Sequence, residues 1–179
     1  LSHSSAASDV YKRQILDTGR FRTFLAEELD VSVNSIDAYV LGGHGDSMVP
    51  LLKATTVGGV PVEELIEKNR LEEIVQRTRD GGAEIVAHLK TGSAYYAPSA
   101  AVAQMVDAII FDTKEVFPCA AMLDGEYGIS GVYAGVPVKL GSSGIEEIVN
   151  LNLSQSEKDG LTASSKAVEE LIEVMKGQS

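Results

Sequence analysis

The sequence predicts an α+β fold, in which helices pack against a mainly antiparallel sheet. Several segments place apolar residues at a helical period, which favours amphipathic helices. Other segments are β-branched runs bounded by glycine-rich turns, which favours strands. The last three runs follow one another through short turns, so antiparallel pairing is expected. With 179 residues, 44% of them hydrophobic and 23% charged, the chain is long enough for one domain with a real core.

The first half of the chain alternates helix and strand signals. A 3.6-residue apolar period predicts a helix over 16–30. An apolar, β-branched strand is expected over 35–43, ended by Gly42–Gly43, and a short second strand over 47–52. Residues 57–66 indicate a turn or hairpin that leads into a short helix.

The second half begins with helices and ends with a sheet. A long apolar stripe predicts a helix over 71–94, which Gly81–Gly82 would kink or bring into close packing. A second helix is expected over 97–110, with Pro98 in its first turn. Three strands over 115–123, 131–140 and 146–153 then precede an amphipathic helix over about 156–175. The expected stripe of that last helix is Leu161, Val168, Ile172 and Met175.

Charge and cysteine content exclude several classes of partner. The net charge of −11 argues against a nucleic acid or an anionic membrane surface. No apolar run approaches the roughly 20 residues that span a bilayer. A single cysteine, Cys119, rules out an internal disulfide and fits a reducing, cytoplasmic setting. Its place in "PCAAML" indicates a buried filler rather than a nucleophile.

Residues 1–14, "LSHSSAASDVYKRQ", are expected to be a non-native leader. They show no helical or strand period and join abruptly to the patterned segment from Ile15. They lack the apolar centre of a secretory signal. Because "DVYKRQ" resembles a translated sequencing-library adapter, we expect the domain to comprise residues 15–179, and His3 carries no functional role.

Asp17 and Arg20 are the first candidate functional residues. Their i, i+3 spacing puts them on one face of the first helix, and that face is the apolar one. A surface ion pair of this spacing would be common and weakly stabilising. Charges that fall where burial is predicted are costly unless they are paired or used, so a functional role is the better interpretation.

His44 lies in "LGGHGDSMVP", where three glycines surround it at a strand end. Glycines remove bulk and allow unusual backbone angles, so the imidazole could approach a ligand closely. Taken alone, a histidine that caps a turn is an equal alternative. His88 flanks a helix stripe and is expected to be an ordinary half-exposed residue.

Together these residues suggest proton transfer at a carboxylate substrate. Asp17 could fix one ring nitrogen of His44 while the other faces the substrate. Arg20 would hold a substrate carboxylate through two parallel hydrogen bonds. This suits redox chemistry at a 2-hydroxy or 2-keto acid. Hydrolysis through Ser47 is weaker because the nucleophile elbow is missing, and His44 with Asp46 offers too few ligands for a metal.

Four stretches resemble the C-terminal half of the NAD-dependent lactate/malate dehydrogenase family. They are "LDTGRFRTFLAEEL", "VLGGHGDSMVPL", "VQRTRDGGAEIVAHLKTGSAYYAPSAA" and "GVYAGVPVKLGSSGIEEIV". The resemblance runs from Ile15 to the C-terminus. "LGGHGD" and "GSAYYAP" are most similar to the malate-type members.

The resemblance implies a role for each residue. His44 falls on the catalytic proton acceptor and donor, Asp17 on its aspartate partner, and Arg20 on the arginine that binds the substrate carboxylate. Ser93 falls on a small polar position near the nicotinamide. The implied reaction is NAD-dependent interconversion of malate and oxaloacetate, and the implied assembly is a homo-dimer or tetramer.

One family feature is missing from the sequence. No G-x-G-x-x-G follows a strand, so the Rossmann, cofactor-binding half is expected to lie outside this chain. The chain alone should therefore bind NAD poorly and turn over little substrate. A dehydrogenase for lactate or another 2-hydroxy acid is the alternative within the family. A non-catalytic oligomerisation or interaction module is the alternative of another class.

Overall fold

Helix α1 (Ser2–Leu29) is the longest element of the computed structural model, which describes residues 2–91 and 95–176. It begins well before the predicted start at residue 16, so residues 2–14 are helical although their sequence shows no period. Once a helical turn exists, each further residue adds a backbone hydrogen bond. The fully buried Phe21 and Leu25 anchor the later turns. The foreign origin of residues 1–14 remains a prediction.

The strands form two sheets, and every pairing between the described strands is antiparallel, as predicted. The small sheet contains β1 (Ile36–Asp37), β4 (Thr56–Val57) and β5 (Val60–Pro61). The large sheet contains β3 (Met48–Pro50), β2 (Val40–Gly42), β7 (Ser130–Gly141) and β6 (Glu115–Asp124), with β8 (Gly144–Ile148) paired to β7. The α+β class is confirmed.

Two predicted strands differ from the structure. The strand expected over 35–43 is divided, because β1 pairs in the small sheet and β2 in the large one. The strand expected over 146–153 ends at Ile148. Beyond it the hydroxyl of Tyr127 donates to the carbonyl of Val149 and accepts from the amide of Leu151, so these backbone groups no longer need a strand partner.

The predicted hairpin and helices are present. After β4 and β5 come α2 (Val62–Leu65), α3 (Lys68–Leu89), α4 (Tyr96–Ile110) and, after the sheet, α5 (Gln155–Lys176). Helix α3 continues through Gly81–Gly82, and Gly81 is buried, so close packing is the correct alternative. On α5 the expected stripe is only partly buried, because Leu161 is covered whereas Met175 is 70% exposed.

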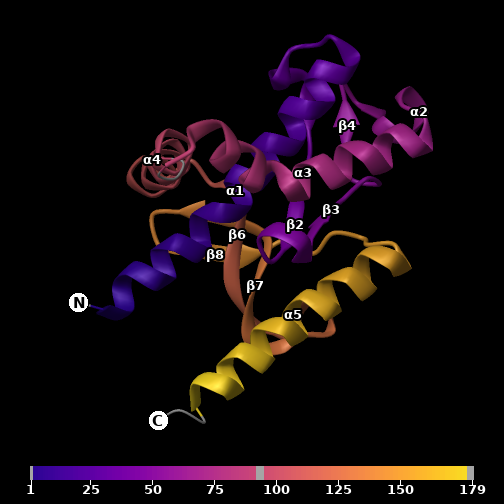
Figure 1. Ribbon diagram of the computed structural model, residues 1–179. Coiled ribbons are helices and arrows are strands. Elements are labelled where there is room, and N and C mark those ends of the chain that lie inside the picture. Colours follow the sequence, from indigo (N-terminus) through magenta and orange to yellow (C-terminus); the bar gives the residue numbers. More distant parts are fainter. Residues whose placement is uncertain (1, 92–94, 177–179) are drawn as a thin grey trace.

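Helices α1 and α5 flank the long β6–β7 hairpin (Figure 1). One apolar cluster lies between the large sheet and the helices α4 and α5, and it includes Leu41, Cys119 and Leu161. A second lies between α1, α3 and the small sheet and includes Phe21 and Ile74. Strand β2 and α1 contribute to both clusters, so the segment that follows β2 is held between the two cores. Within residues 2–91 and 95–176, no helix is both long and apolar enough to cross a membrane.

Candidate active site

Asp17 is the centre of a buried group of polar side chains. Its side chain is fully buried in α1, and each carboxylate oxygen has a separate partner. Arg20 donates from Nη1 to Oδ1 at 2.9 Å, and Nδ1 of His44 lies 2.7 Å from Oδ2. A buried carboxylate is stable only when its oxygens are hydrogen-bonded. The three residues predicted from the sequence are therefore brought together by this one side chain.

The local backbone explains how His44 reaches Asp17. Strand β2 ends at Gly42, whose φ of 76° lies in the left-handed region that glycine tolerates. The next residue, Gly43, has no room for a side chain, because a Cβ there would overlap with Oγ of Ser47. The chain can therefore turn sharply and place the imidazole beside Asp17, near the middle of α1.

Strand β2 is tied to its neighbours by side chains. The hydroxyl of Thr18 accepts the amide hydrogen of Val40 at 3.0 Å, and the carboxamide of Gln14 donates to the carbonyl of Gly42 at 3.0 Å. From the opposite helix, Oγ of Ser164 accepts the amide hydrogen of Gly43 at 2.7 Å. Together these bonds fix the strand that carries His44 on both sides.

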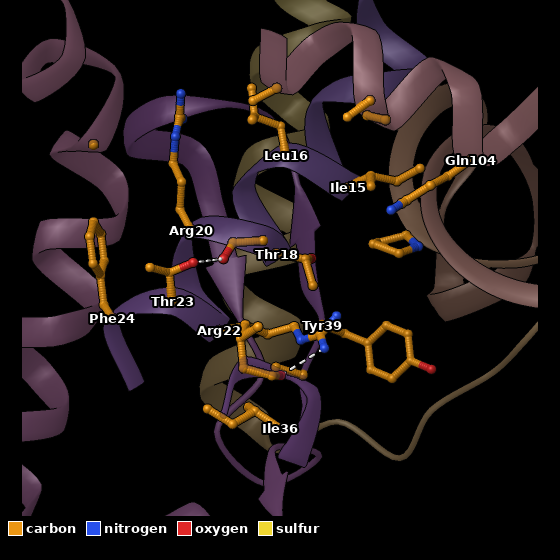
Figure 2. Close-up of a pocket in the computed structure, with 18 of the residues that line it drawn as sticks. Ile15, Leu16, Thr18, Arg20, Arg22, Thr23, Phe24, Ile36, Tyr39 and Gln104 are labelled. Carbon is orange, nitrogen blue, oxygen red and sulfur yellow. Dashed lines mark hydrogen bonds between the residues drawn. The ribbon is translucent and has the colours of Figure 1, made fainter. Parts of the chain in front are cut away.

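Arg20 lies at the edge of a cavity of about 640 Å³. Figure 2 shows this cavity beside α1, with Gln104 reaching into it from α4. Its wall is mostly apolar, and Ile15, Leu16 and Phe117 line part of it. Arg20 is only 11% exposed, and its Nε is buried without a hydrogen-bond partner among the described residues. This guanidinium therefore has donors left over for a ligand.

His44 presents its second nitrogen away from Asp17. Its side chain is 32% exposed and borders a smaller pocket of about 270 Å³. With the Nδ1 hydrogen donated to the Asp17 carboxylate, Nε2 is left as an acceptor, and it has no protein partner in the described part of the chain. In this tautomer Nε2 is the nitrogen that can act as a general base.

The other candidates are less well supported. Ser93 lies outside the described residues. Ser47 donates weakly to the backbone carbonyl of His44 at 3.5 Å and has no hydrogen bond to the imidazole. The geometry therefore does not support the hydrolase alternative. Within residues 2–91 and 95–176 no group of three or more His, Cys, Asp or Glu side chains could hold a metal ion. His88 is exposed and lines the larger cavity.

Some site residues were not predicted. Thr18 lies three and seven positions before the buried Phe21 and Leu25, and that helical spacing could have indicated its burial. Gln14 is 2% exposed, although the sequence placed it in the leader. Nothing local in the sequence points to Ser164, because it lies 121 positions from its partner Gly43.

The fold and the site define the class of protein as an α+β domain with a buried Asp–His–Arg group. The family model for the alpha/beta C-terminal domain of lactate/malate dehydrogenases matches residues 15–178. The chain belongs to this NAD-dependent oxidoreductase family.

Curated relatives are malate dehydrogenases of about twice this length. The enzyme from Chlorobium limicola is 57% identical over 156 residues, which cover 87% of this chain and 50% of that protein. The enzyme from Rhodopirellula baltica is 59% identical over 163 residues, which cover 91% of this chain and 52% of that protein. The chain thus spans about half the length of the curated relatives it matches.

Solved structures of the family superpose well on this chain. Malate dehydrogenase from Salinibacter ruber gives a TM-score of 0.88 at 52% identity, covering 91% of this chain and 53% of that one. Lactate dehydrogenase from Cryptosporidium parvum, solved with lactic acid and NAD, gives 0.88 at 40% identity over 91% of this chain and 53% of that one. The family fold is therefore established independently of the site residues.

Proposed function

We propose that this chain is the substrate-binding and proton-transfer part of a malate dehydrogenase, which interconverts malate and oxaloacetate with NAD. The observation that carries the proposal is the contact of 2.7 Å between Asp17 and His44, with Arg20 bonded to the other oxygen of the same carboxylate. This arrangement couples an acid/base group to a cation that can bind the substrate.

Arg20 binds the substrate carboxylate next to the hydroxyl carbon. Its guanidinium is held in place through Nη1, while its Nε has no hydrogen-bond partner among the described residues. A planar fork of this kind matches a carboxylate by two parallel hydrogen bonds. The substrate is then fixed beside α1, close to the imidazole of His44.

His44 moves the proton. In the oxidation of malate, Nε2 accepts the hydroxyl proton from the carbon that becomes the ketone. The ring is then an imidazolium, which the Asp17 carboxylate stabilises at Oδ2. In the reverse direction the same proton returns to the carbonyl oxygen of oxaloacetate.

The described residues do not fit the body of NAD. Dinucleotide binding uses a parallel strand followed by a glycine-rich turn and a helix N-terminus. All pairings between the described strands are antiparallel. NAD, which supplies the hydride acceptor, is therefore proposed to be held mainly by residues outside this chain, and Ser93 is proposed to line the pocket near its nicotinamide.

Malate is favoured over lactate by the relatives. Curated proteins between 51% and 59% identical to this chain are named malate dehydrogenases. Among solved structures, lactate dehydrogenases from Cryptosporidium parvum and Eimeria maxima are 36% to 41% identical, whereas malate dehydrogenases range from 38% to 52%. Malate and lactate differ in the second substituent of the carbon that carries the hydroxyl group. We therefore propose oxaloacetate rather than pyruvate as the keto substrate.

We also propose that the chain functions within a homo-dimer or tetramer. The outer face of α4 is apolar and exposed, and apolar patches of this kind mark interaction surfaces. The residues are Tyr96, Val102, Val106, Ile110 and Phe111. A reducing, cytoplasmic compartment is consistent with the single buried thiol of Cys119.

The test joins residues 15–179 to the part of the Chlorobium limicola enzyme that precedes its matched region. We expect this chimera to oxidise NADH with oxaloacetate and only weakly with pyruvate. The 179-residue chain alone should show no measurable turnover. A folded chimera that binds NADH but reduces neither substrate would refute the proposal, and a preference for pyruvate would support the lactate alternative.

A matched control separates binding from proton transfer. His44→Gln should abolish turnover in the chimera but retain binding of oxalate, a small dicarboxylate that mimics the substrate. Arg20→Gln should lose both. Equal activity of His44→Gln and the parent chimera would exclude His44 as the acid/base group.

A further inference from the structure

Helix α5 reaches the turn that carries His44 through one buried side chain. Ser164 is 4% exposed, and its Oγ accepts the amide hydrogen of Gly43 at 2.7 Å. Gly43 is bonded directly to His44 in the chain. A residue from the last helix thus contacts the peptide next to the imidazole, on the side of β2 away from α1.

The hydroxyl of Ser164 is used differently from that of its neighbour. Serine within a helix commonly bonds the carbonyl four residues earlier. Ser165 does this, because its Oγ donates to the carbonyl of Leu161 at 3.0 Å. Ser164 instead bonds the glycine turn, 121 positions away in the chain.

The glycine turn and Ser164 are closely packed around this hydrogen bond. A Cβ on Gly42 would lie 2.9 Å from Oγ of Ser164 and 3.2 Å from its Cβ, so the turn fits closely against the serine. The two hydrogen bonds from α1, made by Thr18 and Gln14, hold the amide of Val40 and the carbonyl of Gly42. Among the described residues, Ser164 alone accepts the amide hydrogen of Gly43, which is the last backbone N–H before that of His44.

We infer that Ser164 is a positioning residue for His44, through its hydrogen bond to the amide of Gly43. Without that acceptor, a partly buried N–H loses its partner and the turn relaxes towards water. The relaxation moves His44 relative to Oδ2 of Asp17, and a 2.7 Å hydrogen bond is sensitive to small displacements. The kinetic meaning of this inference rests on the proposed function, but the geometric effect does not.

The test compares Ser164→Ala with Ser165→Ala in the 179-residue chain. Both changes remove a buried hydroxyl from α5, but only the first removes a bond to the turn. Imidazole ¹⁵N spectra report the fraction of the Nδ1–H tautomer of His44 and the exchange rate of that proton with water. We expect Ser164→Ala to speed the exchange about tenfold and lower the tautomer fraction, and Ser165→Ala to change neither.

A second variant covers the case in which Ser164→Ala does not fold. Ser164→Cys keeps the shape but replaces the oxygen by a weak acceptor, so exchange of the Nδ1 proton should lie between that of the parent and that of the alanine variant. An unchanged exchange rate in either folded variant, or the same change in Ser165→Ala, would overturn the inference.

The chimera separates this inference from the proposed function. There, Ser164→Ala should lower kcat for oxaloacetate several-fold and leave KM nearly unchanged, because Arg20 still binds the carboxylate. If the parent chimera is inactive while the spectra of the isolated chain change as expected, Ser164 positions His44 in a domain whose reaction is a different one.

Discussion

Gly81 of α3 lies directly against the side chain of Arg20 in α1. A Cβ at Gly81 would be 3.1 Å from Cδ and 3.6 Å from Nε of Arg20. Arg20 cannot easily give way, because its Nη1 is bonded to the buried Asp17. Glycine inside a helix is unfavourable by about 1 kcal/mol relative to alanine. Helix α3 therefore carries an unfavourable residue at the position where the proposed substrate-binding arginine needs space.

The glycine pair of α3 provides a matched test of this role. At Gly82 a Cβ would lie 4.0 Å from Nη1 of Arg20, which is ordinary contact. Gly82→Ala should therefore stabilise the chain by about 0.5–1 kcal/mol. Gly81→Ala should gain no stability, because the new methyl group displaces Arg20, and in the chimera it should raise KM for oxaloacetate. Urea unfolding and steady-state kinetics measure both effects. Equal stabilisation by the two changes would contradict this account.

The tie between Thr18 and β2 can be tested by an isosteric change. Thr18→Val keeps the shape and the β-branched side chain but removes the acceptor for the buried amide of Val40. An orphaned buried donor costs about 1–3 kcal/mol of unfolding free energy. Thr23→Val is the control, because Thr23 is exposed and its hydroxyl donates only to the carbonyl of Gly19 in the same helix. That change should stay within about 0.5 kcal/mol, and a similar loss in both variants would exclude a special role for Thr18.

Cys119 should make the folded state sensitive to alkaline pH. Burial raises the pKa of its thiol from the ordinary value of 9.0 to about 12. Because the thiol is neutral in the folded state but ionises in the unfolded chain, its stabilising contribution is complete below pH 9. That contribution is lost between pH 9 and 12, by about 1.4 kcal/mol for each pH unit.

Comparison with Cys119→Ala isolates this effect, because the half-buried Tyr39 and Tyr127 also have raised pKa values and remain in both proteins. The free energy of unfolding, measured at pH 8 and at intervals up to pH 10.5, should fall more steeply in the parent chain. In the same range a thiol reagent should modify Cys119 only after unfolding. Parallel pH profiles would show that the thiol ionises while the chain is folded.

Local patterns predicted most of the fold because they depend on residues close together in the chain. The apolar period of α1 and α3 and the turns between β6, β7 and β8 are of this kind. The division of residues 35–43 was not predictable, since it depends on two sheets that meet there. The early end of β8 depends on Tyr127, whose hydroxyl competes for backbone groups 22 and 24 positions away.

The candidate site divides in the same way. Asp17 and Arg20 could be predicted because charges on an apolar helix face conflict with the local pattern. His44 could be predicted because the glycines that flank it are its neighbours in the sequence. Thr18 and Ser164 look like ordinary polar residues in helices, and only the tertiary structure shows that each accepts a buried amide. Gly81 was singled out, but the sequence could not show that its partner is Arg20.

Asp17→Asn is the most direct test of the proposed mechanism. The carboxylate accepts from both Arg20 and His44, whereas an amide offers one oxygen and one NH₂ group. If the oxygen faces Arg20, the NH₂ faces Nδ1 and favours the tautomer in which Nε2 carries the hydrogen, which removes the base. If the amide is reversed, two donors face each other at Arg20. In the chimera kcat should fall about 100- to 10,000-fold.

Asp46→Asn, on an exposed residue two positions after His44, should be nearly neutral. Loss of the Nδ1–H signal of His44 in Asp17→Asn alone would connect the kinetic change to the tautomer, whereas full activity of Asp17→Asn would eliminate the carboxylate as the partner of the base.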